Sequence, residues 1–106
     1  MSTTSKATKL SIVTEKLNEQ AIERIVMEAG GKGYTVFDGS GRGSHSTKTR
    51  DRASVVGAFS LVKIEVIIAD RAVADDIVDQ VSAGYFGDFS GIVYLEEVEI
   101  LRREKF

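Results

Sequence analysis

AFSLVKIEVII, residues 58–68, is the stretch that decides the fold. Its apolar side chains alternate with polar ones and are mostly β-branched, which is typical of a strand with one buried face. Lys63 and Glu65 fall on one face, and the other face carries Val62, Ile64, Val66 and Ile68. We expect this longest strand to lie in the centre of a sheet.

Three shorter stretches show the same period of two and predict three further strands. They are residues 9–14 (KLSIVT), residues 33–38 (GYTVFD) and residues 92–95 (IVYL), the last continuing through Val98, Ile100 and Leu101. We expect residues 1–8 to form a flexible tail.

Two amphipathic helices are predicted between these strands. Asn18 can cap the first helix, which Gly30 and Gly31 end, and Asp70 can cap the second, which Gly84 ends. Their apolar positions recur at helical spacing: Leu17, Ala21, Ile22, Ile25, Val26 and Ala29, then Val73, Ala74, Ile77, Val78 and Val81. We interpret Asp75, Asp76 and Asp79 as a solvated helix face rather than as metal ligands.

The order of the elements predicts an α+β fold, a ferredoxin-like βαββαβ sandwich with a four-stranded antiparallel sheet and both helices on one face. At 106 residues the chain fits a single domain. The second sheet face would leave apolar residues such as Phe59, Leu61 and Ile67 exposed on a monomer. Because large exposed apolar patches usually mark interfaces, we expect the sheets to associate into an oligomer.

Composition excludes several function classes. The chain has no Cys, so disulfides and Cys-based metal or nucleophile sites are excluded. No stretch reaches the roughly 18 apolar residues of a spanning helix, and residues 1–9 (MSTTSKATK) lack the apolar core of a signal peptide. We expect a cytoplasmic protein that does not insert into a membrane and meets one only through a partner.

Positive charge is concentrated in one stretch. Residues 42–52 hold Arg42, Lys48, Arg50 and Arg52 against the single acidic Asp51, although the whole chain has a net charge of −2. A general nucleic-acid binder normally carries a whole basic face. A small anion, or an acidic patch on a partner protein, fits this distribution better than nucleic acid does.

Two glycine-rich loops are the candidate anion sites. Residues 41–44 (GRGS) and 87–91 (GDFSG) combine glycines that permit close backbone approach with hydroxyl donors, and His45 and Lys48 add positive charge to the first loop. Ordinary glycine-rich turns remain the alternative interpretation. For His45, the only histidine, a phosphate contact is favoured over a catalytic or metal-binding role because a mobile loop rarely positions a base.

Two other functions stay open at this point. Residues 57–62 (GAFSLV) faintly echo the third strand of RNA-recognition domains, but residues 9–14 offer no aromatic ring for base stacking. A small nucleotide phosphohydrolase would use the same loops, with His45 or Asp88 assisting a water molecule.

Three motifs together resemble a known family. GYTVFDGSGRG (33–43), VKIEVIIAD (62–70) and GYFGDFSGIVYL (84–95) look like the PII signalling proteins, and specifically the cyanobacterial carbon-regulatory PII-like proteins of the SbtB type. The resemblance extends over nearly the whole chain. It implies a homotrimer that binds adenine nucleotides in the clefts between subunits, with residues 39–56 as the T-loop and residues 85–91 as the B-loop.

The resemblance also implies site residues by position. Thr35 and Glu65 would lie near adenine or ribose, and Arg102 would reach a phosphate. The loops would supply the remaining contacts, from Gly41, Gly43, Ser44, His45 and Lys48 in the T-loop and from Gly87, Asp88, Phe89, Ser90 and Gly91 in the B-loop.

The implied function is regulatory. The protein would have no catalytic residues and no metal site of its own, and its ligand would be AMP, cyclic AMP, ADP or ATP, with a divalent cation as an option beside ATP. Its T-loop would dock on a membrane bicarbonate transporter during inorganic carbon acclimation, leaving the protein peripherally membrane-associated. The T-loop contains no tyrosine to modify, and His45 and Gly91 stand near places where classical members have glutamine and lysine. These departures make AMP-like ligands more plausible.

Overall fold

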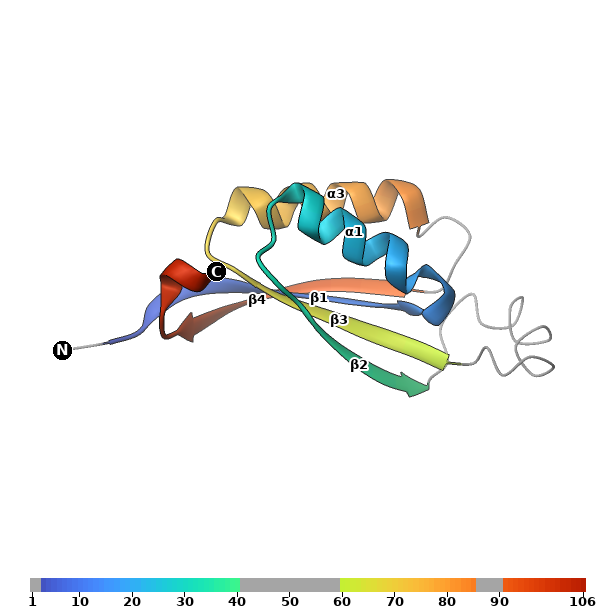
Figure 1. The fold of residues 1–106 in the computed structure, drawn as a ribbon, viewed down its shortest axis with the longest axis horizontal. Coiled ribbons are helices and arrows are strands. Elements are labelled where there is room, and N and C mark those ends of the chain that lie inside the picture. Colours follow the sequence, from blue (N-terminus) through green and yellow to red (C-terminus); the bar gives the residue numbers. More distant parts are fainter. Residues whose placement is uncertain (1–2, 41–59, 86–90) are drawn as a thin grey trace.

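The computed structural model describes residues 3–40, 60–85 and 91–106. These residues form one four-stranded antiparallel sheet in the order β2-β3-β1-β4, with both helices on the same face (Figure 1). The elements, in chain order, are β1 (Ser5–Glu15), η1 (Lys16–Asn18), α1 (Glu19–Ala29), β2 (Thr35–Ser40), β3 (Ser60–Ile68), α3 (Arg71–Tyr85), β4 (Gly91–Ile100) and η2 (Arg103–Lys105). The predicted ferredoxin-like α+β fold is confirmed.

The core lies between the sheet and the helices. Alternate residues of β1 and β3 face the helices, as the period of two predicted, and the innermost positions of both helices meet them. The buried cluster comprises Leu10, Ile12, Ile22, Val26, Val62, Ile64, Val66, Ile68, Ala74, Ile77 and Val81. Since each large aliphatic side chain contributes about 1.5–3 kcal/mol on burial, this layer is the main source of stability.

Some of the predicted helix caps and helix ends are confirmed, and others are wrong. Gly30 adopts a left-handed conformation with φ of 117°, and its N–H bonds back to α1, which ends there. At the start of α3, an Asp70 carboxylate oxygen accepts the Ala72 N–H at 2.9 Å. Asn18 does precede α1, but its side chain donates to Thr14 Oγ1 at 3.3 Å and caps nothing. The prediction that Gly84 ends the second helix is wrong, because α3 runs through Tyr85.

Other boundaries also differ from the predictions. Residues 5–8 belong to β1 and pair with β4, so the predicted tail is at least four residues too long. Leu17 lies in η1 and is 64% exposed, although it was predicted to face the core. Gly39 and Ser40 extend β2, Tyr85 ends α3 and Gly91 begins β4, and the rest of both predicted loops lies outside the described residues.

The sheet face opposite the helices, here called the open face, carries no covering element within the described residues (Figure 1). Leu61 and Ile67 are half-buried on it, while Phe37, Ile92 and Tyr94 are exposed. Phe59 lies outside the described residues. The predicted exposure of apolar area on this face is thus seen at several strands, and such area favours association with another surface.

Candidate functional site

Thr35 and Glu65 lie side by side on the open face. The β2–β3 register pairs Thr35 with Glu65, and on the next strands Ser11 pairs with both Glu65 and Tyr94. Because neighbours such as Val36 and Ile64 pack toward the helices, these four residues form one row across the opposite face. The structure therefore brings together the two residues that were expected beside adenine or ribose.

The Glu65 carboxylate is held between two lysines. Its Oε2 atom lies 3.7 Å from Lys9 Nζ and 3.7 Å from Lys63 Nζ, and its side chain is only 22% exposed. Lys9 also reaches Glu96 Oε1 at 3.2 Å. The hydrogen bond to Glu96, then the attraction to Glu96 and Glu65, raises the pKa of Lys9. A carboxylate fixed in this way keeps lone pairs free to accept from an amine or a hydroxyl.

Sequence reasoning did not assign Lys9, Lys63, Phe37 or Glu96 to the site. Lys63 Nζ lies 4.9 Å from the centroid of the Phe37 ring, within the range of a cation–π contact. The alternation in residues 58–68 already placed Lys63 beside Glu65. The contributions of Lys9 and Glu96 depend on strand register, which that pattern does not contain.

Ser11, in the middle of the row, has a fully buried side chain. Its Oγ has no hydrogen-bond partner among the described residues. Because neighbouring side chains cover Ser11 completely, this hydroxyl is not accessible to a group that docks on the open face, and its missing hydrogen bond is a local cost to stability.

Arg102 lies at the turn that follows β4. It is exposed and adopts a left-handed conformation (φ 56°, ψ 53°), the single residue other than glycine with positive φ in the described parts of the chain. Together with Leu101, Lys105 and Phe106 it lines a pocket of about 370 Å³.

Gly91 and Arg102 are not brought together within one chain. Gly91 pairs with Thr14 at one end of β4, and Ile100 pairs with Ser5 at the other. A ten-residue strand spans about 30 Å, so the two candidates lie at opposite ends of the sheet (Figure 1). The row that contains Glu65 crosses β4 at Tyr94, also well removed from Arg102. One chain therefore does not complete the predicted set.

The remaining candidates lie outside the described residues, and their roles stay predictions. They are Gly41, Gly43, Ser44, His45, Lys48, Gly87, Asp88, Phe89 and Ser90.

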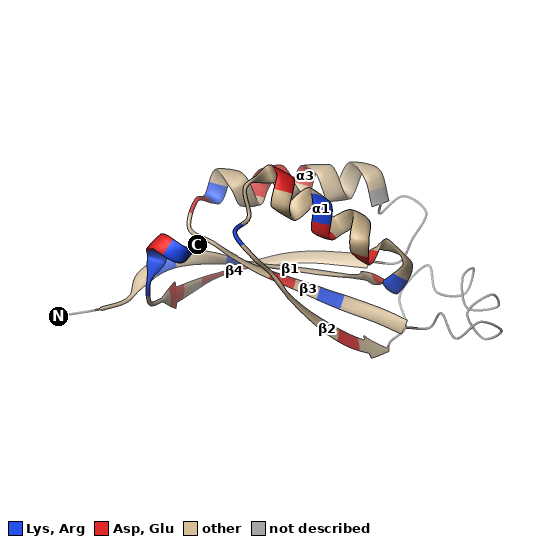
Figure 2. Cartoon of the chain, in the orientation of Figure 1, with Lys and Arg blue, Asp and Glu red and all other residues tan. Residues whose placement is uncertain are grey.

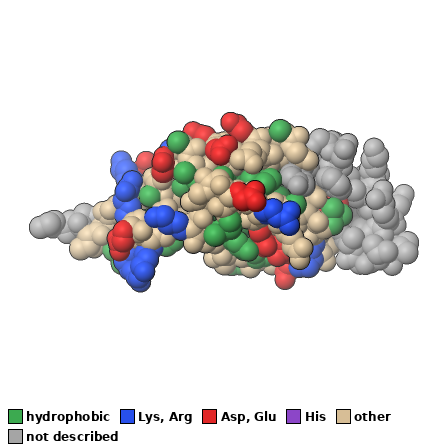
Figure 3. Space-filling view, turned by 45° about the horizontal axis from the view of Figure 1, so that its top comes forward, with side chains coloured by type: hydrophobic (Ala, Val, Ile, Leu, Met, Phe, Trp, Pro, Cys, Tyr) green, Lys and Arg blue, Asp and Glu red, His purple; other side chains and the backbone are tan. Residues whose placement is uncertain are grey.

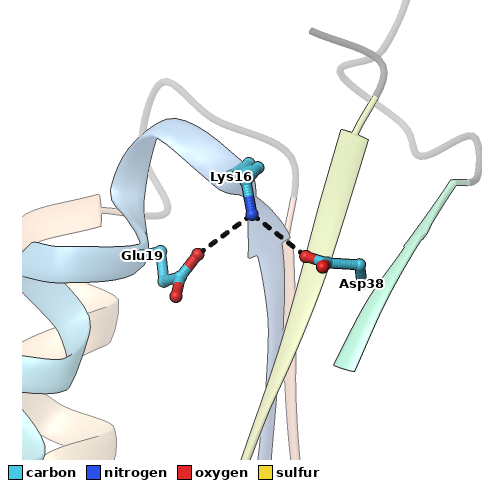
Figure 4. Close-up of polar contacts among 3 residues, drawn as sticks. All are labelled: Lys16, Glu19 and Asp38. Carbon is cyan, nitrogen blue, oxygen red and sulfur yellow. Dashed lines mark hydrogen bonds and ion pairs between the residues drawn. The ribbon is translucent and has the colours of Figure 1, made fainter. Parts of the chain in front are cut away.

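A polar cluster ties the start of α1 to β2 (Figure 4). Lys16 Nζ lies 3.0 Å from Asp38 Oδ1 and 3.4 Å from Glu19 Oε1. The hydrogen bond to Asp38, followed by that to Glu19, raises the pKa of Lys16. These contacts help to place the edge strand that carries Thr35.

The described residues contain neither a group of metal-binding side chains nor a helix that could span a membrane. No three His, Cys, Asp or Glu side chains in these parts of the chain are grouped to hold a metal ion. Neither of the described α-helices is long and apolar enough to cross a membrane.

Comparison with known proteins identifies the family. The fold resembles that of a PII-like signalling protein from Thermus thermophilus, with 28% identity, 99% coverage of both chains and a TM-score of 0.79. It also resembles CPII from Thiomonas intermedia K12, solved with ADP, AMP and acetate, at 23% identity, 97% and 96% coverage and a TM-score of 0.78. A second CPII structure contains ADP and bicarbonate, with 22% identity, the same two coverages and a TM-score of 0.78. The sequence model of the nitrogen regulatory protein P-II family matches residues 7–105, and the chain therefore belongs to that family.

Proposed function

We propose that this protein is a PII-like regulator that assembles as a homotrimer and binds an adenine nucleotide in the clefts between its subunits. The observation that carries the proposal is the position of Thr35 beside Glu65 on the open face, while Arg102 lies beyond the far end of β4. A ligand that contacts all three residues needs Arg102 from a neighbouring subunit. Trimers are typical of the family, and the apolar residues of the open face suit such an assembly.

The chemistry of these side chains suits a nucleotide. The Glu65 carboxylate accepts from an exocyclic amine or a ribose hydroxyl, Thr35 supplies a neighbouring hydroxyl, and Arg102 can bind phosphate in bidentate geometry. The CPII structures contain ADP and AMP, which supports the same ligand class here. The proposed ligands are AMP, cyclic AMP, ADP and ATP, with a divalent cation accompanying ATP where one is used.

The proposed site extends into both loops. The T-loop residues Gly41, Gly43, Ser44, His45 and Lys48 and the B-loop residues 87–91 would contact the nucleotide from the same subunit as Glu65. No catalytic step is assigned to any of them.

The open face supports a small nucleotide over RNA as the ligand. The central strand β1 presents no aromatic ring on this face, and the carboxylates of Glu65 and Glu96 lie on the strands either side of it, where an RNA-binding sheet would present stacking rings. Because Lys9 and Lys63 are paired with these carboxylates, the row has no surplus positive charge to neutralise a phosphate backbone, and such neutralisation provides most of the affinity for nucleic acid.

We further propose that the protein is of the SbtB type and that its T-loop, residues 39–56, docks on a membrane bicarbonate transporter. A nucleotide would control docking through its different affinities for the docked and the free state of the loop. Two observations support this proposal. The motifs resemble those of the SbtB type, and the structural neighbour CPII was solved with bicarbonate bound. Tagged protein should retain the solubilised transporter, and the retained amount should change with the nucleotide added. Equal retention by a chain without residues 41–56 would contradict the docking role.

Calorimetry with AMP, cyclic AMP, ADP and ATP, each with and without Mg²⁺, tests nucleotide binding. Glu65→Gln should lower the affinity for the tightest-binding nucleotide about tenfold or more, because a hydrogen bond to a charged group contributes about 1.5–3 kcal/mol. Glu28→Gln makes the same charge change on α1, on the opposite side of the sheet, and should leave affinity unchanged. Absence of binding by all four nucleotides to the unmodified protein would overturn the proposal.

A further inference from the structure

Lys9 connects two carboxylates on the open face. It lies on the inner strand β1, and its Nζ atom is 3.2 Å from Glu96 Oε1 and 3.7 Å from Glu65 Oε2. Glu96 comes from β4 and Glu65 from β3, the strands on either side of β1. The Lys9 side chain is only 28% exposed, so both ion pairs are partly shielded from water and from salt.

Lys63 also approaches the Glu65 carboxylate, but from within the same strand. The two residues are two positions apart on β3 and therefore share a face, and Figure 2 shows an acidic and a basic position close together along this strand. Lys63 Nζ is 3.7 Å from Glu65 Oε2 and 4.9 Å from the centroid of the Phe37 ring. Lys9 is thus the cation that restrains Glu65 from a different strand, and Glu96 holds Lys9 on its far side.

A ligand that donates to Glu65 benefits when this carboxylate is already held in place. An unrestrained glutamate side chain loses rotamer freedom on binding, and that loss weakens the complex. The ion pairs with Lys9 and Lys63 reduce this freedom before the ligand arrives. The hydrogen bond to Glu96, then the charges of Glu96 and Glu65, raise the pKa of Lys9, so its ammonium group stays charged at neutral pH.

We propose that Lys9 is a positioning residue of the nucleotide site: it holds the Glu65 carboxylate where that group accepts a hydrogen bond from the ligand. The inference rests on the proposed function. The donor on the ligand is either the 6-amino group of adenine or a ribose hydroxyl, the two kinds of group from which a carboxylate at this place accepts. Because Lys9 acts only through Glu65, its removal matters only for ligands that carry this donor.

Lys6 provides the matched control. It lies on the same strand, three residues before Lys9 and hence on the opposite face, and it forms a longer ion pair, to Glu97 at 3.9 Å. Figure 3 shows basic side chains gathered at the end of the molecule where Figure 1 draws η2 and the start of β1. Replacing Lys6 therefore tests the effect of net charge without changing the surroundings of Glu65.

The experiment measures the affinity of the full chain by calorimetry, with ADP as the probe, or AMP if that binds more tightly. Lys9→Met should lower the affinity about fivefold, less than Glu65→Gln does, because Lys63 remains beside the carboxylate. Lys9→Arg keeps a cation at this place and should retain most of the affinity, and Lys6→Met should change it less than about twofold. No loss in Lys9→Met, or an equal loss in Lys6→Met, would overturn this inference and leave the proposed function intact.

Three analogues of the probe separate positioning from a general effect on the fold. One lacks the 6-amino group, one the 2′-hydroxyl and one the 3′-hydroxyl. The analogue without the donor to Glu65 should bind the Lys9→Met variant and the unmodified chain equally, whereas the loss should persist for the other two. A change in the fold would instead weaken the probe and all three analogues by one common factor, and that result would overturn the inference. Failure of the unmodified chain to bind any adenine nucleotide would overturn the proposed function itself.

Discussion

Gly31 is the position at the end of α1 with the least room for a side chain. A Cβ atom there would lie 2.7 Å from Val26 Cγ1 and 2.9 Å from the Val26 carbonyl oxygen, which also accepts the Gly31 N–H. Val26 is fully buried, so neither atom moves without disturbing the core. We predict that Gly31→Ala lowers the free energy of unfolding by about 1–3 kcal/mol, measured by urea unfolding at a fixed protein concentration.

Gly33→Ala is the control for this prediction, because a Cβ atom there would have no neighbour within 4 Å. Both variants lose the same flexibility of the unfolded chain, so the difference between them isolates the contact with Val26. Equal urea midpoints for the two variants would show that Val26 gives way and that the prediction is wrong.

The sequence predicted which side chains face the core but not which ones meet on the open face. Alternation placed Lys63 and Glu65 on one face, and the structure agrees. The pairing of Glu65 with Thr35 and its ion pair with Lys9 depend on the register between strands far apart in sequence, which local periodicity does not contain. The left-handed Arg102 has no sequence signal at all, because only the contacts of the folded turn impose that conformation.

A contact whose strength depends on pH connects α1 to the residue that precedes β2. Glu23 on α1 hydrogen-bonds to Glu19 and to Tyr34, the residue before β2. Burial and the neighbouring Glu19 carboxyl raise the pKa of Glu23 above its usual value of 4.5, while Tyr34 and Lys16 act in the opposite direction. Glu23 is therefore protonated more readily in the folded chain than in the unfolded chain.

The stability of the fold should depend on this proton. Because the folded-state pKa of Glu23 is above its unfolded value, the folded chain binds more protons just above pH 4.5, and the free energy of unfolding falls as the pH rises through that window. Glu23→Gln removes the titrating group, so its unfolding free energy should fall less than that of the unmodified chain between pH 4.5 and about pH 7. Urea unfolding at both pH values measures the difference. Identical pH dependence in Glu23→Gln and the unmodified chain would contradict the prediction.

Sequence predicted the type of every long element and placed some of the boundaries incorrectly. A glycine permits a left-handed helix end without requiring one: Gly30 uses that freedom, whereas α3 passes through Gly84. Leu17 fits the helical period, but the tighter turn of η1 precedes α1 and turns this side chain outward. Such outcomes depend on how each segment packs against the sheet, and propensity alone does not include that information.

In the whole molecule, the length of β4 determines whether the residues that contact one ligand come from one subunit or from two. The row that contains Glu65 and the turn that contains Arg102 are too far apart to contact one nucleotide from the same chain. If the proposed clefts lie between subunits, each cleft takes Glu65 from one chain and Arg102 from the next. A Glu65→Ala chain and an Arg102→Ala chain should then each bind poorly alone and complement each other in a mixed trimer.

Mixing the two variants under unfolding conditions and refolding them together tests this arrangement. With random assortment in a cyclic trimer, about a quarter of the clefts receive an intact Glu65 and an intact Arg102, so calorimetry should recover that share of the sites at the affinity of the unmodified protein. The separately refolded variants are the control and should show none of these sites. If mixing restores no binding, either the two residues act within one subunit or they do not share a ligand, because only a cleft built from two chains can regain both side chains from parents that each lack one.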